Sequence, residues 1–332
     1  MTTLYVQHDG CTLTRQDSTL IVRYRENDQS HQQRIPVEKV GAVVIGTGCH
    51  ITSGAIQLLL SLQVPISFVD YHERFVGALH TPINGNQLLR RQQYQAAENP
   101  EMQLYLAYHF LGGKMQNQRT LIQRYARENA ALDVYVSQMA SFIKSLETVS
   151  DIPMMMGYEG QVAKLYFEAL GQIFGEAWGF TGRNRRPPRD PINAMLSYGY
   201  TVLEAFITSA LHQVGLDPYV GFVHSLFPGR KSLALDLLEE FRPVIVDSAV
   251  LGLIGNQMLK PADFQIQLGV CLMPEDTRKT FLQRFQQRMD QSVQHPITQE
   301  KTTYSRLIVS QARQIGAFLL GDIEGYVPVR IR

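Results

Sequence analysis

The chain has 332 residues, of which 45% are hydrophobic and 18% are charged. This length allows one large domain or two moderate ones, and the composition excludes a mainly disordered chain. A formal net charge of +1 excludes a protein that attracts a polyanion through its overall charge. However, 23 of the 31 basic residues are arginines, whose planar side chains match the geometry of phosphate oxygens.

The three cysteines give a first indication of the compartment. Cys11, Cys49 and Cys271 are far apart and show no spacing typical of metal ligands or of a disulfide framework. The N-terminus lacks the basic and apolar layout of a signal peptide, and no apolar run reaches the roughly 20 residues of a membrane span. We therefore expect a soluble, reduced, cytoplasmic protein.

Residues 1–82 are predicted to be rich in β-structure. Short apolar or β-branched runs alternate with turn residues, the pattern typical of strands. Strands are predicted over residues 4–6, 19–22, 42–45, 66–69 and 75–79. Thr52 precedes a short apolar run, 55–60, which favours a capped helix. We expect a small sheet domain, similar to a β-sandwich, with one inserted helix.

The pattern changes after Pro82, where a proline and an Asn-Gly pair predict a linker over residues 83–89. Apolar residues then recur at intervals of three and four, which indicates helices. Helices are predicted within residues 87–148 and over 159–174, 191–214, 232–255, 274–293 and 302–321. The predicted fold class is therefore α+β, with a larger all-α domain at 90–332 that carries the active site.

Glu159 is the first candidate functional residue. It lies between Gly157 and Gly160, which would allow close approach of a ligand, and we place it at the N-terminal edge of the helix over 159–174. Acidic residues are common in the first turn of a helix because the helix dipole favours them. A purely structural role is therefore the alternative for Glu159.

His224 is the second candidate. It follows a turn that contains Pro218 and Gly221, on a segment that we predict to be a loop. Histidine is the usual ligand or proton carrier near neutral pH, and functional residues are frequent on loops. The alternative is a structural histidine.

A third segment, residues 232–243, is a predicted helix that carries three acids. Asp236, Glu239 and Glu240 are spaced so that they share one helix face. A solvated acidic face is one interpretation. The leucines around these acids favour another, in which the helix is buried and the acids serve a site.

Two carboxylates and one imidazole form a ligand set that is rich in oxygen. Such a set suits Mg²⁺ or Mn²⁺ better than Zn²⁺. A divalent ion held in this way can polarise a phosphoryl oxygen and activate water or a hydroxyl group. The chemistry that these residues suggest is phosphodiester cleavage or transfer.

Four motifs occur in order between residues 159 and 243. They are E-G-x-x-A at 159–163, D-P-I-N-A-M-L-S-Y-G-Y at 190–200, G-F-V-H at 221–224 and S-L-A-L-D-L-x-E-E-F-R-P at 232–243. Together they resemble the CRISPR-associated adaptation integrase, the universal nuclease-integrase of spacer acquisition. The predicted β-rich start, linker and helical remainder resemble the layout of that family over the whole chain.

The resemblance implies specific site residues. The metal ligands and catalytic residues of the family fall on Glu159, His224 and Glu239, and Asp236 matches an acidic position that lines the same site. Helix geometry alone does not separate Glu239 from Glu240, so both Asp236 and Glu240 stay as additional acids. The choice of Glu239 rests on the resemblance.

The resemblance also implies an activity and partners. The protein would be a homodimer in the cytoplasm of a prokaryote, with the sheet domain of residues 1–82 as its expected dimer interface. It would act with a small partner Cas protein and hold a short DNA duplex. It would join the 3′-hydroxyl ends of that duplex to the CRISPR repeat by transesterification. With water as the nucleophile, the same site would act as an endonuclease.

DNA contacts should be made mainly to phosphate groups, because a spacer-capturing enzyme accepts many sequences. Several arginines lie in a proline-rich run, 182–191, that we expect to be a mobile basic loop. The candidate DNA-binding residues are Arg90, Arg91, Arg183, Arg185, Arg186, Arg189, Arg230 and Lys231. Ordinary solvated surface charge is the alternative for each of them.

Two other functions compete with the integrase. One is a metal-dependent phosphatase or hydrolase of small substrates that uses the same acids. The other is a non-catalytic scaffold that binds nucleic acid. A hydrolase of small molecules has no need for several separate arginine clusters, whereas a scaffold has no need for the acids.

Overall fold

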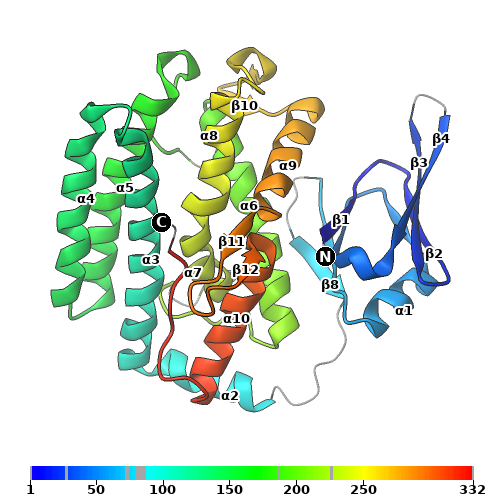
Figure 1. The fold of residues 1–332 in the computed structure, drawn as a ribbon, viewed down its shortest axis with the longest axis horizontal. Helices are drawn as coiled ribbons and strands as arrows, with labels where there is room; N and C mark the ends of the chain where they lie inside the picture. The colour runs from blue at the N-terminus through cyan, green and yellow to red at the C-terminus, as the bar shows by residue number, and fades with distance from the viewer. Residues whose placement is uncertain are drawn as a thin grey trace.

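The computed structural model describes residues 2–26, 29–71, 75–79, 87–184, 187–224 and 227–330. A β-rich N-terminal region lies beside a larger helical region, as Figure 1 shows. Each region has a hydrophobic core of its own. These features confirm the predicted α+β fold, with a small sheet region followed by a larger helical one.

Two four-stranded sheets make up the N-terminal region. Their elements are β1 (Thr2–Val6), β2 (Thr12–Gln16), β3 (Thr19–Glu26), β4 (Gln29–Pro36), β5 (Val40–Ile45), β6 (His50–Ile51), β7 (Ile66–Val69) and β8 (Phe75–Leu79). The first sheet has the order β1-β5-β7-β8, in which only β7 and β8 pair antiparallel. The second has the order β4-β3-β2-β6, with β2 and β6 parallel. Helix α1 (Ser53–Ser61) packs against β2, and Thr52 caps it as predicted.

The sequence did not reveal β2, β4 or β6. Strand β4 is the clearest case, because it consists mainly of polar, exposed residues and its Pro36 ends it at an outer position of the sheet. An edge strand that faces water on most sides lacks the apolar alternation that identifies a strand. Its pairing with the apolar strand β3 determines its structure.

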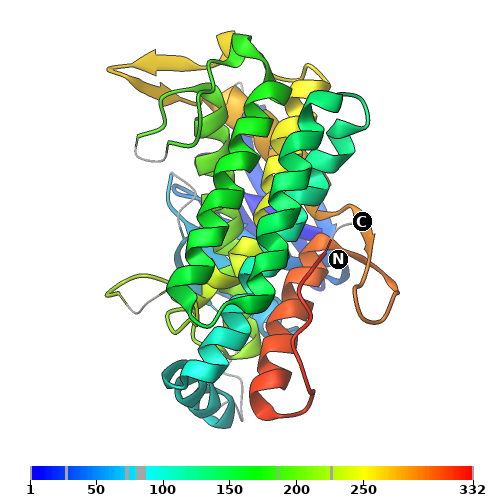
Figure 2. The ribbon, with the colours of Figure 1, turned by 90° about the vertical axis from the view of Figure 1, so that its left-hand side faces the viewer.

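The helical region contains nine α-helices among the described residues. They are α2 (Gln87–Glu98), α3 (Pro100–Ala126), α4 (Asp133–Ser145), α5 (Ile152–Phe174), α6 (Pro191–Val214), α7 (Ser232–Phe241), α8 (Ser248–Gly255), α9 (Glu275–Met289) and α10 (Tyr304–Leu320). Helices α3, α4 and α5 pack side by side (Figure 2). Helix α6 has the predicted bounds, because Asp190 caps its start and Gly215 ends it with a positive φ.

Two predicted helices differ from the structure in ways that affect the site. Helix α5 begins at Ile152, not at 159, because Asp151 caps it and Pro153 occupies its first turn. Glu159 therefore lies inside the helix, where the dipole argument does not apply. The predicted helix over 232–255 is divided into α7 and α8 by a π-helical segment, Arg242–Asp247, a type of distortion that is frequent at functional sites.

The helical region also contains two short hairpins, so it is not strictly all-α as predicted. One pairs β9 (Gln265–Gln267) with β10 (Val270–Leu272), and the other pairs β11 (Ser292–Gln294) with β12 (Lys301–Thr303). Each strand has three residues, which is too short for an apolar alternation to be recognised in the sequence. None of the described helices is long and apolar enough to cross a bilayer.

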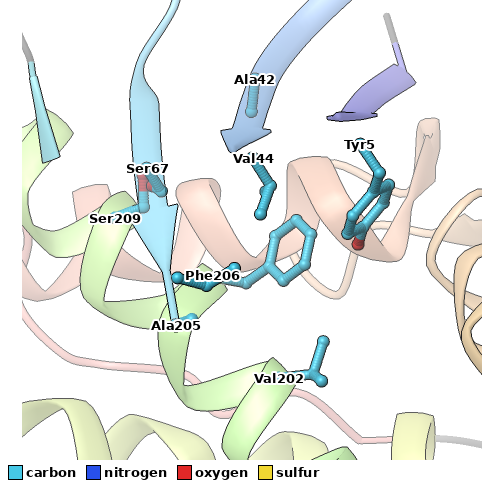
Figure 3. A pocket seen from close by; sticks show the side chains of 9 residues that line it. Tyr5, Ala42, Val44, Ser67, Val202, Ala205, Phe206 and Ser209 are labelled. Atoms are coloured by element: carbon cyan, nitrogen blue, oxygen red, sulfur yellow. The ribbon is translucent and has the colours of Figure 1, made fainter. Parts of the chain in front are cut away.

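Helix α6 connects the two regions. It contacts β7 and β8, and Val44, Val69 and Ala205 form a small buried cluster there. Figure 3 shows a mainly apolar pocket at this contact, into which Tyr5 and Phe206 project. Residues 80–86 of the predicted boundary lie outside the described residues, and α2 begins at Gln87, inside the predicted linker. The domain boundaries themselves stay a prediction.

Candidate active site

Glu159 and Glu239 come from different helices and meet at one point. Glu159 lies on α5 and Glu239 on α7, and both helices pack against α3. The Nζ atom of Lys114, on α3, is 2.5 Å from Oε1 of Glu159 and 2.6 Å from Oε2 of Glu239. The two carboxylates therefore lie within reach of a single cation.

Burial makes the charges of this cluster interact strongly. Arg242 adds a second cation, with Nη2 3.4 Å from Oε1 of Glu239. Burial alone would raise the pKa of Glu239, but Arg242, Lys114 and His224 outweigh it and lower that pKa to about 2. Burial likewise opposes the charge of Lys114, yet Glu239 and Glu159 raise its pKa. Both groups therefore stay charged near neutral pH.

His224 is held by Asp236. Its Nδ1 atom is 2.6 Å from Oδ1 of Asp236, and its backbone N–H donates to the same oxygen over 3.1 Å. The backbone N–H groups of Phe222 and Val223 donate to Oδ2 of Asp236 over 2.6 and 3.0 Å. In the neutral imidazole with Nδ1–H donating to the carboxylate, Nε2 would offer a lone pair. Histidines that bind metals are commonly oriented in this way.

Gly221 permits this arrangement. A Cβ atom at this position would lie 2.5 Å from Oδ2 of Asp236 and 2.6 Å from the carbonyl carbon of Ser232. Any larger residue would therefore push the loop away from α7. The glycine of the G-F-V-H motif is explained by close packing of the loop on the acidic helix.

The three acids of α7 do not point to one place, although their spacing predicted a shared face. Asp236 faces the loop, Glu239 faces Lys114, and Glu240 accepts hydrogen bonds from Tyr326 and Val329 near the C-terminus. Helix α7 is buried around its whole circumference, so neighbouring acids contact different partners. Burial raises the pKa of Glu240 to about 8, against the opposing effect of its hydrogen bonds.

A second buried network lies next to Arg242. Asp247 accepts hydrogen bonds of 2.6 Å from the hydroxyl groups of Tyr166 and Tyr200. The guanidinium of Arg242 lies over the Tyr200 ring at 4.7 Å from its centroid, and that of Arg183 lies at 5.5 Å. Burial raises the pKa of Asp247 to about 6. This network holds the guanidinium of Arg242, which pairs with Glu239.

The donor set is compatible with a divalent metal ion. Among the described residues, no three His, Cys, Asp or Glu side chains already form a metal-binding cluster. Yet the buried Glu239 and the half-buried Glu159 converge on one ammonium group. The imidazole of His224, oriented by Asp236, interacts electrostatically with Glu239. Oxygen-rich sets with one nitrogen suit Mg²⁺ or Mn²⁺. Glu159, Glu239 and Nε2 of His224 are the atoms that would hold such an ion.

The basic residues that were predicted to contact DNA differ in their surroundings. The Arg183 side chain donates to Asn193 and Ser197, so the described part of its loop is tied to α6. Lys231 pairs with Glu204, and Nε of Arg90 donates to the carbonyl of Gly215. Arg91 and Arg189 are exposed, whereas Arg230 is half-buried. Arg185 and Arg186 lie outside the described residues.

Lys114, Arg242 and Asp247 belong to the site although the sequence did not single them out. Lys114 did give a signal, because it is a lone lysine within an apolar stretch of a long predicted helix, and a buried lysine needs a partner. Asp247 lies beyond the acidic motif, and nothing in a helical pattern predicts a π-helical segment there. The missed residues are those that hold the predicted ones in place.

Comparisons with known proteins identify the family. A family model described as "CRISPR associated protein Cas1" matches residues 4–287. The chain is also 36% identical to "CRISPR-associated endonuclease Cas1 2" of Rhodospirillum rubrum, over 99% of this chain and 98% of that protein. The chain belongs to the Cas1 family. This result confirms the predicted family and the predicted class of enzyme, a CRISPR-associated endonuclease.

Solved structures share the fold of this Cas1 chain. A chain described as "Casposase bound to integration product" has a TM-score of 0.81 and 24% identity, and the match covers 98% of this chain and 93% of that one. A "Cas6-RT-Cas1--Cas2 complex" gives a TM-score of 0.78 with 22% identity, over 100% of this chain and 36% of that one. Endonucleases of this kind use divalent metal ions.

Proposed function

We propose that this Cas1 protein joins 3′-hydroxyl ends of short DNA duplexes to the CRISPR repeat, by transesterification at Glu159, His224 and Glu239. The same site would cut DNA when water replaces the hydroxyl group. One phosphodiester bond forms while another breaks, so no external energy source is needed.

The observation that supports it most is the convergence of Glu159 and Glu239 on one buried cation. Two carboxylates that lie close together in a helical core repel each other and lower the stability of the fold, unless a cation lies between them. Lys114 supplies that cation here, and Arg242 adds a second positive charge. A phosphodiester that enters such a site meets groups arranged for charge stabilisation.

Each residue has a separate task in this proposal. A bound Mg²⁺ or Mn²⁺ supplies a Lewis acid beside the phosphodiester. Glu159 and Glu239 supply fixed negative charge for binding that ion, and the positive charge of Arg242 keeps Glu239 ionised. Asp236 orients His224, whose Nε2 can bind the ion or accept the proton of the attacking hydroxyl group.

The family and two solved structures with the same fold support the proposed substrates and partners. One relative was solved with an integration product and another in a complex with Cas2. We infer that this chain acts on double-stranded DNA as a homodimer through its β-rich region, with a small partner Cas protein. Arg91, Arg189 and Arg230 are the described basic residues best placed to contact phosphate groups.

A strand-transfer assay tests this function. The protein and its small partner are incubated with a short duplex, a supercoiled plasmid that bears the repeat, and Mn²⁺. We expect joined product with the wild type and none with Glu159→Ala or His224→Ala. A duplex without its 3′-hydroxyl group should give no joined product, which separates transesterification from hydrolysis.

The exposed residue Glu168 provides a matched control, because it lies on the same helix as Glu159. Glu168→Ala should retain wild-type strand transfer. The proposal is wrong if Glu159→Ala or His224→Ala acts like the wild type. Hydrolysis of a phosphate monoester without any DNA product would instead favour a hydrolase of small substrates.

A further inference from the structure

The last described residues of the chain form an extended segment that packs into the helical region. We call residues Asp322–Arg330 the C-terminal strap. It leaves the end of α10 and runs back beside α3 (Figure 1). The family model ends at residue 287, so the strap lies beyond it. Nevertheless, Tyr326 and Val329 of the strap are 1% and 2% exposed, so these two residues are part of the core.

Glu240 fastens the strap to α7. The hydroxyl group of Tyr326 donates to Oε1 of Glu240 over 2.5 Å, and the backbone N–H of Val329 donates to Oε2 over 2.8 Å. The side-chain amide of Gln311 donates to Oε2 over 3.3 Å. Glu240 is fully buried, and none of the described lysines or arginines forms an ion pair with it. Three hydrogen bonds therefore compensate for its burial.

The strap also contacts α3, on both sides of Lys114. The side-chain amide of Asn117 donates to the carbonyl groups of Val329 and Glu240, over 2.8 and 2.9 Å. On the other side, Pro328 packs so closely on Gly113 that a Cβ atom there would lie 2.8 Å from Cβ of Pro328. The strap therefore contacts α3 and α7 next to two residues of the proposed site, Lys114 and Glu239.

A shift of α7 relative to α3 would separate Lys114 from Glu239, and the strap opposes that shift. Two further hydrogen bonds hold it to α10, between Val327 and the side chains of Gln314 and Gln311. A buried polar side chain is costly unless it is hydrogen-bonded, so Glu240 is a poor choice for simple core packing. As a fixed acceptor for two strap residues, it gives the two helices a defined spacing.

We propose that Glu240 and Tyr326 are positioning residues, through which the C-terminal strap fixes the distance between Glu239 and Lys114. This inference rests on the proposed function of the Glu159 and Glu239 site. Neither positioning residue touches the substrate in this proposal. Their effect reaches the reaction through the placement of α7, and small displacements of reacting groups can cost about 100-fold in rate.

Tyr326→Phe and Glu240→Gln test the proposal at almost constant volume. The first removes the hydroxyl group that donates to Glu240, and the second replaces one acceptor oxygen of Glu240 by an NH2 donor. In the strand-transfer assay we expect kcat to fall about 10- to 100-fold, with little change in KM for the DNA duplex. Calorimetric titration of the protein alone with Mn²⁺ should show an affinity that is several-fold weaker. Circular dichroism and thermal unfolding establish that each variant is folded under the assay conditions.

Glu324→Gln is the matched control, because Glu324 lies on the same strap and is exposed. It should match the wild type in kcat and in Mn²⁺ affinity. The proposal is overturned if folded Tyr326→Phe keeps wild-type kcat and Mn²⁺ affinity, even if it unfolds at a lower temperature. If Glu240→Gln does not fold, Tyr326→Phe still decides the question. Absence of strand transfer by the wild type would contradict the proposed function, while the Mn²⁺ titration would still test the strap.

Discussion

Asp236 illustrates how a residue can matter without facing the substrate. It is fully buried, and its two oxygens accept four N–H groups from residues 222–224. The sequence indicated an acidic position of interest here, but the spacing alone placed it on the same face as Glu239. Only the fold shows that its partner is His224, because the loop that carries His224 precedes α7 and packs back onto it.

Asp236→Asn should reduce strand transfer about 10- to 100-fold, the usual effect of changing a group that orients a metal-binding histidine. The asparagine amide has one acceptor oxygen, whereas the aspartate carboxylate has two. Two of the four N–H groups of residues 222–224 therefore lose their acceptor. The assay with Mn²⁺ measures the effect, and circular dichroism checks the fold. Activity equal to that of the wild type would show that the orientation of His224 is unimportant.

The raised pKa of Asp247 predicts that the free energy of unfolding depends on pH. Burial holds its pKa at about 6 in the folded protein, against a usual value of 3.8, despite Tyr166, Tyr200, Arg242 and Arg183 nearby. Between these values the unfolded chain is ionised and the folded one is not, so rising pH favours unfolding. Relative to that of Asp247→Asn, the free energy of unfolding of the wild type should fall from pH 4 to pH 6 and then stay constant.

Urea unfolding of both proteins across this pH range measures the difference. Taking the difference removes the contributions of other titrating groups that the two proteins share. A difference that does not change between pH 4 and pH 6 would contradict the raised pKa of Asp247.

At the scale of elements, the glycines around the site have opposite roles. Gly160 lies inside α5 and is exposed, and a Cβ atom there would meet nothing within 4 Å. Gly221 is buried against Asp236 and Ser232. In the sequence, both glycines lie near candidate site residues. Only the packing shows that Gly221 has no space for a side chain, whereas Gly160 has.

Gly160→Ala should stabilise the protein by about 0.5–1 kcal/mol, because alanine loses less backbone entropy in a helix. Gly221→Ala should destabilise it by about 1–3 kcal/mol, since its Cβ atom must displace the loop or α7. Chemical denaturation gives both values. If Gly221→Ala were as stable as the wild type, the close packing of the loop on α7 would be wrong.

Elements with strong local signals were predicted from the sequence. Helix α6 is the best case, because Asp190 and Gly215 mark both of its ends. Prediction failed where long-range contacts decide the structure. The polar strand β4 depends on pairing with β3. The π-helical segment after α7 carries Asp247, whose hydrogen-bond partners Tyr166 and Tyr200 lie on other helices. Glu159 and Glu239 were named from the sequence. Lys114 was not, because its place between them depends on the packing of α3 against α5 and α7.

At the scale of the whole molecule, an almost neutral chain must bind DNA through local basic sites. Arg189 is exposed, whereas Arg183 is held by Asn193 and Ser197. Arg189→Gln should therefore weaken binding of duplex DNA and reduce the salt dependence by about one phosphate contact. Arg183→Gln should mainly lower thermal stability. Fluorescence anisotropy at several salt concentrations distinguishes the two, and unchanged binding by Arg189→Gln would remove it from the interface.

The central claim is that Glu159 and Glu239 together hold a divalent metal ion. Calorimetric titration of the full-length protein with Mn²⁺ tests it most directly, with Glu159→Gln, Glu239→Gln and the exposed control Glu168→Gln. We expect wild type and Glu168→Gln to bind Mn²⁺ equally well, and both site variants to lose measurable binding. Binding of wild-type strength by Glu159→Gln or Glu239→Gln would contradict the account.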